Sequence, residues 1–166
     1  MAKLYLKQKV FSWGDKFNVY NEFGEEIYHV KGEVFTLGKK LHVYDLQERE
    51  LAFIHEKLWS FKAKYFISRD GTDIAQVVKE ITFLKAKYTV EAFGWLIQGN
   101  FLDHEYQITR GEQTVARISH KWLSWGDTYE IDIANGEDVI NVLCAVLIID
   151  AVKASQAASA AAASST

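Results

Sequence analysis

A long apolar segment near the end of the chain, residues 137–153, restricts the possible folds more than any other feature of the sequence. Between Val139 and Val152, only Asn141 and Asp150 interrupt its apolar character. Strands are usually 3–10 residues long, so a segment of this length is predicted to be a helix. A helix that is apolar on every side must be buried on every side in a soluble protein. It is also shorter than the roughly 20 residues needed to cross a bilayer, so the chain is not predicted to be transmembrane.

The residues that flank this segment favour a helix over about 136–153. Asn135 is a suitable N-cap, Glu137 and Asp138 suit the positive end of the helix dipole, and Lys153 suits the negative end. The side chains expected to pack inside the protein, with a structural role only, are Val139, Leu143, Cys144, Val146 and Leu147.

Two-residue alternation of apolar and polar residues dominates the rest of the chain, up to about residue 133. The predicted strands are residues 4–6, 16–20, 26–30, 33–37, 40–44, 50–55, 59–67, 74–79, 82–90, 95–100, 105–109, 114–120 and 128–133. Short turns rich in Gly, Asn and Asp separate these strands, as in antiparallel hairpins. The sequence therefore predicts a mainly β fold, an antiparallel closed barrel of about twelve strands with the apolar helix inside it. The chain has no proline, which agrees with a closed sheet because such a sheet has few positions for a residue without an N–H.

The chain is predicted to be one domain, residues 1–153, followed by a low-complexity Ala/Ser tail, residues 154–166, which either extends the helix or frays. The tetrapeptide Ser-Trp-Gly-Asp occurs twice, each time before an alternating strand. Gly and Asp suit a tight turn and the Trp side chain suits the barrel edge, so a structural role is preferred over a ligand site at the rim. The residues concerned are Trp13, Gly14, Asp15, Trp125, Gly126 and Asp127.

Charge and cysteine content exclude several classes of function. The formal net charge is −3, which is too balanced for a protein that binds nucleic acid over its whole surface. Residues 1–90 carry an excess of Lys and Arg, whereas residues 91–166 carry an excess of Asp and Glu. The single cysteine, Cys144, lies in the apolar segment and is predicted to be a reduced, buried thiol. The N-terminus has no apolar stretch of signal-peptide length, so a cytoplasmic location is expected.

No catalytic or metal-binding motif stands out. The five histidines fall on separate predicted strands without metal-ligand spacing, and no Walker A, GxSxG or GxGxxG motif is present. Paired carboxylates occur at turns, where caps and solvated turns account for them. No metal, cofactor or enzymatic activity is therefore predicted. An enzyme with an unrecognised site at the barrel rim is a third functional hypothesis, after the two given at the end of this subsection.

Two short lysine-containing strands suggest a binding surface. Alternation places Lys62 and Lys64 on the face opposite Ala63 and Tyr65, and Lys85 and Lys87 follow the same pattern. If the two strands are neighbours, four ammonium groups share one surface, which would attract an anionic lipid headgroup or phosphate. Lys39, Lys40 and Lys79 are candidates to extend it. The alternative is that these lysines protect an edge strand from aggregation.

The chain resembles the LURP-one-related family of the tubby-like and phospholipid-scramblase-like superfamily. The residues that carry the resemblance are 5–20, 24–32 and 136–150, in that order along the chain. The resemblance implies a barrel closed around an apolar C-terminal helix. It also implies an analogy with tubby domains, which bind phosphoinositide headgroups through cationic side chains. The LURP-one-related branch has no established activity, and the chain lacks the Pro-rich arm, palmitoylation cluster and calcium segment of scramblases.

The functional hypothesis is a non-enzymatic binding or scaffold domain that recognises anionic lipid headgroups, in the cytoplasm and at the inner membrane surface. The alternative is a protein-interaction scaffold or a homodimer that uses an aromatic-rich surface. The oligomeric state does not follow from the sequence, and no nucleic-acid partner is expected.

Overall fold

The computed structural model describes residues 1–7, 16–80, 85–124 and 126–165, which form twelve strands, one short 3₁₀ turn and one long helix. The strands are β1 (Ala2–Lys7), β2 (Lys16–Tyr20), β3 (Glu26–Gly32), β4 (Lys40–Tyr44), β5 (Glu50–Glu56), β6 (Lys64–Arg69), β7 (Thr72–Glu80), β8 (Lys87–Val90), β9 (Trp95–Asn100), β10 (Glu105–Arg110), β11 (Gln113–Leu123) and β12 (Gly126–Ile133). The 3₁₀ turn η1 covers Glu91–Phe93, and the helix α1 covers Val139–Ser164.

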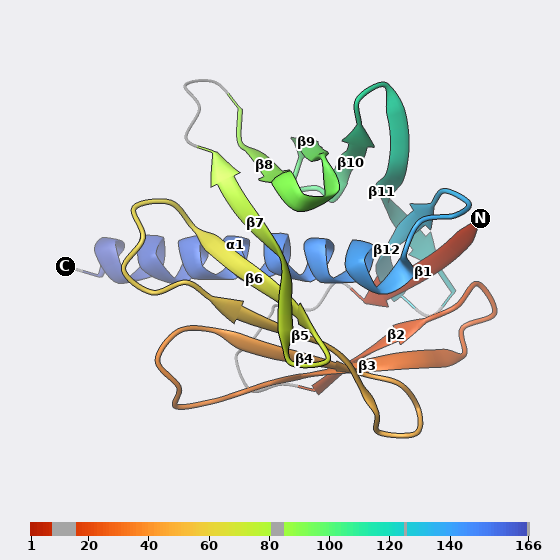
Figure 1. Cartoon of the computed structure of the whole chain (residues 1–166), viewed down its shortest axis with the longest axis horizontal. Coiled ribbons are helices and arrows are strands. Elements are labelled where there is room, and N and C mark those ends of the chain that lie inside the picture. Colours follow the sequence, from red (N-terminus) through yellow and green to blue (C-terminus); the bar gives the residue numbers. More distant parts are fainter. Residues whose placement is uncertain (8–15, 81–84, 125, 166) are drawn as a thin grey trace.

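The twelve strands form one closed antiparallel barrel in which each strand pairs with its sequence neighbours, and β1 closes the sheet against β12. Helix α1 runs through the middle of the barrel (Figure 1). Inward-facing residues alternate along the strands, as at Leu41 and Val43 on β4 or Ala52 and Ile54 on β5, and they are buried against α1. The predicted fold class is confirmed.

The core helix begins later and ends later than predicted. Its N-cap is Asp138, whose Oδ1 accepts a hydrogen bond from the Asn141 backbone N–H at 2.9 Å, and not Asn135. The helix continues through the Ala/Ser tail to Ser164, because nothing after Lys153 breaks it and alanine has the highest helix propensity. The predicted core residues Leu143, Cys144, Val146 and Leu147 are fully buried, and Val139 is partly buried.

By length and composition alone α1 could cross a membrane, but most of its apolar part is enclosed by the barrel. The buried side chains of this helix form the centre of the core. Its apolar composition is therefore accounted for by packing inside the barrel and requires no contact with lipid.

Several local predictions differ from the structure. Residues 59–63 were predicted as the first part of a strand over 59–67 but lie in the loop 57–63, and β6 begins only at Lys64. Residues 33–37 were predicted as a strand but lie in a loop between β3 and β4. The pairing of β3 with β4 ends with Gly32 opposite Leu41, and the residues between form the connection. Gly126 and Asp127 were predicted to form a tight turn but are the first residues of β12, paired with Leu123 and Trp122. Gly126 has φ +117°, which explains why glycine occupies it. Trp13, Gly14, Asp15 and Trp125 lie outside the described residues.

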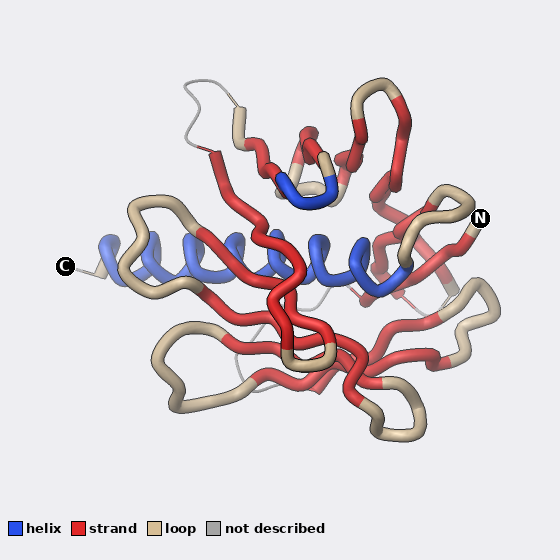
Figure 2. Tube along the Cα trace, in the orientation of Figure 1, coloured by secondary structure: helices blue, strands red, loops and turns tan. Residues whose placement is uncertain are grey.

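The direction of α1 defines two ends of the barrel, which we call the amino end and the carboxyl end. At the amino end, Arg69 Nη1 lies 3.3 Å from Asp138 Oδ2, and Arg110 Nη1 lies 2.8 Å from Glu137 Oε1. The carboxyl end carries the loops 33–39, 57–63 and 101–104. The first two project on the side of the C-terminus (Figure 2). Lys39 Nζ donates a hydrogen bond to Ser155 Oγ there, so the loop 33–39 contacts the emerging helix.

Candidate functional site: the basic rim of the barrel

Most of the described lysines lie at the carboxyl end of the barrel, whereas the turns of the amino end are rich in acidic residues. Among the lysines that the structure describes, Lys3 alone lies at the amino end, because the others fall in strand halves, loops or the helix segment at the carboxyl end. The turns of the amino end hold Glu22, Glu25, Asp45, Glu48, Asp70, Glu91, Glu112, Glu137 and Asp138. The net charge of −3 therefore conceals an excess of lysine at one end and an excess of carboxylate at the other. Arg49, Arg69 and Arg110 offset part of the acidic excess, and Glu33, Glu80 and Glu105 offset part of the basic one.

We define the basic rim as the lysines that gather around the emerging helix at the carboxyl end. They are Lys39, Lys40, Lys57, Lys62, Lys64, Lys79, Lys85, Lys87 and Lys153. They come from the ends of β4, β6, β7 and β8, from the loops beside them, and from α1. The up-and-down topology brings them together, since every second connection of such a barrel lies at the same end.

The four lysines predicted to share one face do not form a single patch. Lys64 is on β6 and Lys87 is on β8, and β7 lies between these two strands. Glu80 on β7 binds Lys62, with Nζ to Oε2 at 2.6 Å. It also accepts a hydrogen bond from Thr89 Oγ1 at 3.1 Å. The interaction with Lys62 holds the pKa of Glu80 below its usual value, so this carboxylate is ionised and neutralises part of the predicted patch.

The lysines instead line two adjacent hollows on either side of Glu80. The first, of about 750 Å³, is lined by Phe61, Lys62, Lys64 and Glu80 among others. The second, of about 1060 Å³, is lined by five cationic residues and one carboxylate, and its other polar residues are Gln, Asn and Tyr. The charged residues of this second hollow are Lys79, Lys85, Lys87, Arg117, Lys153 and Glu105.

Electrostatics favour an anion in the second hollow. Burial lowers the pKa of Lys79 and of Lys153, which means that the surroundings of each ammonium group replace only part of its hydration. Lys153 Nζ lies 3.2 Å from His104 Nε2 and 3.5 Å from the Leu102 carbonyl oxygen. No carboxylate in the described part of the chain lies within salt-bridge distance of Lys64, Lys79 or Lys87. Asp150 and Asp103 act on Lys153 at longer range, and Glu80 lies opposite Lys87 on the neighbouring strand. An anionic group bound in the hollow would add direct contacts to these longer-range interactions.

The two outlying lysines of the prediction, Lys39 and Lys40, lie elsewhere on the rim. Lys39 bonds to Ser155 and is partly buried, which lowers its pKa. Lys40 Nζ is 3.4 Å from Glu33 Oε2. The charge of Lys40 is therefore partly neutralised by Glu33. The hollow around Lys79, Lys87 and Lys153 is a stronger candidate anion site than the surface around Lys39 and Lys40.

Arg117 and Lys153 are the members of this hollow that sequence reasoning did not assign to a site. Lys153 was placed at the negative end of the helix, but α1 continues well beyond it and Lys153 lies at the rim. Arg117 is on β11, opposite Gln107 of β10, and joins the hollow through the register of β8 to β11. Only this register, which alternation cannot supply, brings Lys87, Gln98, Gln107 and Arg117 into one row.

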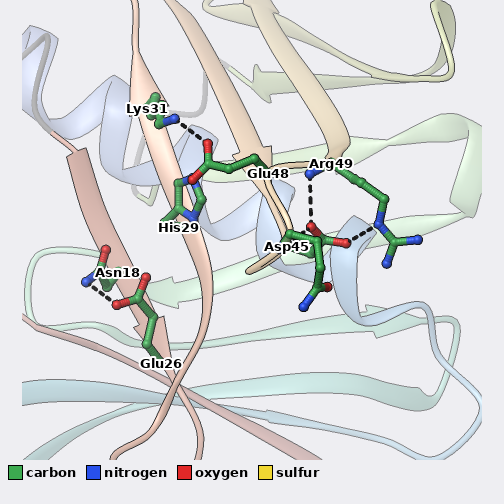
Figure 3. Close-up of polar contacts among 8 residues, drawn as sticks. Asn18, Glu26, His29, Lys31, Asp45, Glu48 and Arg49 are labelled. Carbon is green, nitrogen blue, oxygen red and sulfur yellow. Dashed lines mark hydrogen bonds and ion pairs between the residues drawn. The ribbon is translucent and has the colours of Figure 1, made fainter.

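Charged side chains near the opposite end are paired with one another (Figure 3). Arg49 Nε is 2.7 Å from Asp45 Oδ2, and Glu48 bridges Lys31 Nζ at 2.7 Å and His29 Nε2 at 3.2 Å. The lysine of β3 thus turns away from the basic rim. These contacts satisfy the charges internally and leave little potential for an external anion.

Three of the histidines do come together, but with aromatic rings between them. His29, His42 and His55, on β3, β4 and β5, are separated by Tyr44 and Phe53, with ring centroids 4.6 to 6.1 Å apart. His29 and His55 each have one carboxylate partner, Glu48 and Asp73. His42 lies between two, with Nδ1 2.6 Å from Glu50 Oε2 and Nε2 2.7 Å from Glu33 Oε1. Within the described residues, no group of three or more His, Cys, Asp or Glu side chains is arranged to hold a metal ion.

The described residues form a closed twelve-stranded barrel around a buried C-terminal helix, and this arrangement defines a class of barrel domains. The chain belongs to the LURP-one-related family, whose model matches residues 2–150. This match confirms the resemblance inferred from the sequence.

Two similar proteins were found. One, "Uncharacterized protein YxjI" of Bacillus subtilis (strain 168), is 38% identical over 152 residues, which cover 92% of this chain and 94% of that protein. The other is an Arabidopsis thaliana protein with an X-ray structure, which superposes with a TM-score of 0.66 at 17% identity over 92% of this chain and 91% of that one. The second likeness shows the shared fold.

Proposed function

We propose that this protein is a non-enzymatic binding domain that docks its basic rim on the anionic headgroups of membrane lipids. The observation that carries the proposal is the gathering of lysines at the carboxyl end, around a hollow that holds Lys79, Lys87 and Lys153 without carboxylate partners within salt-bridge distance among the described residues. In this proposal the protein acts in the cytoplasm, at the inner surface of the membrane.

Charge distribution supports an orientation as well as an attraction. A lysine close to an anionic membrane contributes about 1 kcal/mol, and several lysines on one rim add their contributions. The acidic amino end is repelled by the same surface, so the barrel axis would stand with its carboxyl end toward the lipid. Lysine is a point charge without the bidentate geometry of arginine, so the rim favours anionic surfaces in general over one exact phosphate geometry.

Co-sedimentation with vesicles tests this proposal. The protein should bind vesicles of phosphatidylcholine with phosphatidylserine or a phosphoinositide, and should not bind phosphatidylcholine alone. Binding should weaken as salt is raised from 50 to 500 mM, since exposed charges are then screened. The double variant Lys79→Gln, Lys87→Gln should weaken binding about 30-fold, which is what two contributions of about 1 kcal/mol amount to.

Lys3→Gln is the control, because it removes one lysine charge from the amino end, where Lys3 pairs with Glu130. It should bind as the wild type does. The proposal fails if the wild type ignores anionic vesicles at low salt, or if Lys3→Gln weakens binding as much as the rim variant.

A further inference from the structure

Large apolar side chains that face solvent gather on the same rim as the lysines. Of those exposed in the described residues, Met1, Phe23 and Leu46 lie at the amino end. The remainder lie in loops or strand ends at the carboxyl end: Val34, Phe35, Leu37, Leu58, Trp59, Phe61, Leu102 and Trp122. Single exposed apolar residues are ordinary on protein surfaces, whereas a cluster indicates an interaction site.

The centre of this cluster is formed by two loops that lie against each other, 33–39 and 57–63. Lys39 N–H donates to Glu56 Oε2 at 3.0 Å, and the Glu56 N–H donates to the Lys39 carbonyl at 2.8 Å. Leu58 packs so closely on Gly38 that a Cβ at Gly38 would lie 2.8 Å from its Cδ2. The two loops are therefore joined at their bases, and both project at the carboxyl end (Figures 1 and 2).

The aromatic residues at the loop tips are fully exposed. Phe35, Trp59 and Phe61 have no contact that shields their rings from water. Phe35 and Trp59 also have φ values of +59° and +57°, in the left-handed region that is unfavourable for bulky residues. An isolated soluble domain gains nothing from strained backbone that presents aromatic rings to water, so the arrangement indicates a partner.

The surroundings of the loops favour a lipid bilayer as that partner. Lys39, Lys40, Lys57, Lys62 and Lys64 lie in or next to the two loops. The buried centre of a protein interface is depleted of lysine, whereas aromatic rings flanked by lysine suit the boundary between headgroups and acyl chains. The aromatic rings can enter this boundary while the ammonium groups stay at the level of the phosphates.

We infer that the loops 33–39 and 57–63 insert Phe35, Leu37, Trp59 and Phe61 into the headgroup region of an anionic bilayer. This inference rests on the proposed function and adds the apolar contact that holds the protein on the membrane after its lysines have attracted it. The two contributions differ in their response to salt, because screening weakens the lysine contribution and leaves apolar burial intact.

The double variant Phe35→Ser, Phe61→Ser separates the contributions. It should bind vesicles of phosphatidylcholine and phosphatidylserine about 100-fold more weakly than the wild type, since each buried Phe accounts for roughly ten-fold. Its salt dependence should equal that of the wild type. Phe23→Ser, in an exposed turn at the amino end, is the matched control and should leave the affinity unchanged.

Fluorescence of Trp59 reports insertion directly. Lipids with brominated acyl chains should quench part of the wild-type tryptophan emission on binding, and the Trp59→Phe variant should lose most of this quenching. Thermal unfolding of each variant checks that the loops tolerate the change, as expected for side chains with no buried contacts.

The outcomes distinguish this inference from the proposed function. If anionic vesicles bind the wild type and the Phe35→Ser, Phe61→Ser variant equally, and brominated lipids do not quench Trp59, then insertion is wrong and docking by the basic rim stands. If the wild type binds no anionic vesicle, both are wrong. If light scattering shows a dimer that the double variant loses, and vesicles do not bind, the loops contact a second copy of the chain and insertion is wrong.

Discussion

Asp150, which is the only acidic residue of the core helix, lies 3.1 Å from His104 Nε2 through its Oδ1. Its other oxygen, Oδ2, accepts a hydrogen bond from the Tyr129 hydroxyl. The rings of His104 and Tyr129 stack with centroids 4.1 Å apart, so the loop 101–104 is fastened both to the helix and to β12. A charge inside an apolar barrel is tolerated because these partners satisfy it.

Removal of the Tyr129 hydroxyl should destabilise the protein. Tyr129→Phe leaves one carboxylate oxygen of the partly buried Asp150 without its donor, which costs about 1–3 kcal/mol. Urea unfolding followed by circular dichroism measures the loss. Tyr44→Phe is the control, since Tyr44 is on the outer face and its ring contacts would remain; its change should stay within about 0.5 kcal/mol. Equal effects of the two substitutions would contradict the assigned role of Tyr129.

Substitution of Gly99 should be more damaging than substitution of any open turn glycine. Gly99 has φ +143°, and a Cβ there would lie 2.5 Å from the Glu105 carbonyl oxygen and from Tyr106 Cα. Backbone would have to move to admit it. Gly111 also has a positive φ, of +57°, but nothing lies within 4 Å of its Cβ position. Gly111→Ala should therefore cost only the left-handed conformation, about 1–2 kcal/mol. Gly99→Ala should cost more, as measured by the urea midpoint, and a smaller cost would be inconsistent with this close approach.

The thiol of Cys144 should react only after unfolding. It is completely buried, and burial raises its pKa to about 12, so the reactive thiolate is scarce at neutral pH. A thiol reagent such as dithionitrobenzoate should therefore leave the folded protein unmodified for hours at pH 8 and label it fully in 6 M guanidinium chloride. Rapid labelling without denaturant would show that α1 is accessible in the barrel.

The fold could be predicted from the sequence largely because its two signals are local. Alternation identifies the strands, and the length of the apolar segment at 137–153 identifies a helix that has no place except inside them. The prediction failed at residues 33–37 and at residues 59–63, where apolar residues such as Phe35, Leu37 and Trp59 resemble a strand in composition but lie in exposed loops. Hydrophobic pattern cannot distinguish a strand buried in a core from an apolar loop that faces outward.

The candidate site was predictable in composition but not in arrangement. Lys62, Lys64, Lys85 and Lys87 do lie at one end of the barrel, and the repeat Lys-Ala-Lys-Tyr indicated it. Strand β7 separates the two lysine pairs, and its Glu80 lies between them. This arrangement depends on the pairing of β6 and β8 with β7. The contribution of Arg117 depends on the register of β10 and β11. Long-range register is decided by packing on the core and has no local signature.

Acid should weaken the contact between β7 and the loop 57–63. Lys62 donates to Glu80 and holds its pKa below the ordinary 4.5, so this carboxylate binds a proton more readily in the unfolded chain than in the folded protein. Its contribution to stability is complete above about pH 4.5 and is lost as the pH falls through the lowered native pKa. Lys62→Met should therefore reduce stability by a few tenths of a kcal/mol at pH 7, as expected for an exposed pair.

The difference between Lys62→Met and the wild type should shrink toward zero as the pH is lowered through that native pKa in urea unfolding experiments. Lys64→Met is the matched control, because no carboxylate of the described residues lies within salt-bridge distance of Lys64. Its difference from the wild type should not depend on pH in this range. A pH-independent effect of Lys62→Met would show that the pair with Glu80 does not contribute.

Placement of a charge at the middle of the core helix should prevent folding. Leu143 is fully buried where α1 passes through the barrel, and Leu143→Asp would put a carboxylate where apolar side chains surround it. The cost of an unpaired buried charge exceeds the whole stability of a typical domain unless the group takes up a proton. The variant should be insoluble or lack a cooperative thermal transition. Ser159→Asp adds the same charge to the exposed tail of the same helix and should melt as the wild type does. A cooperatively folded Leu143→Asp variant would disprove the burial of α1, on which the closed barrel depends.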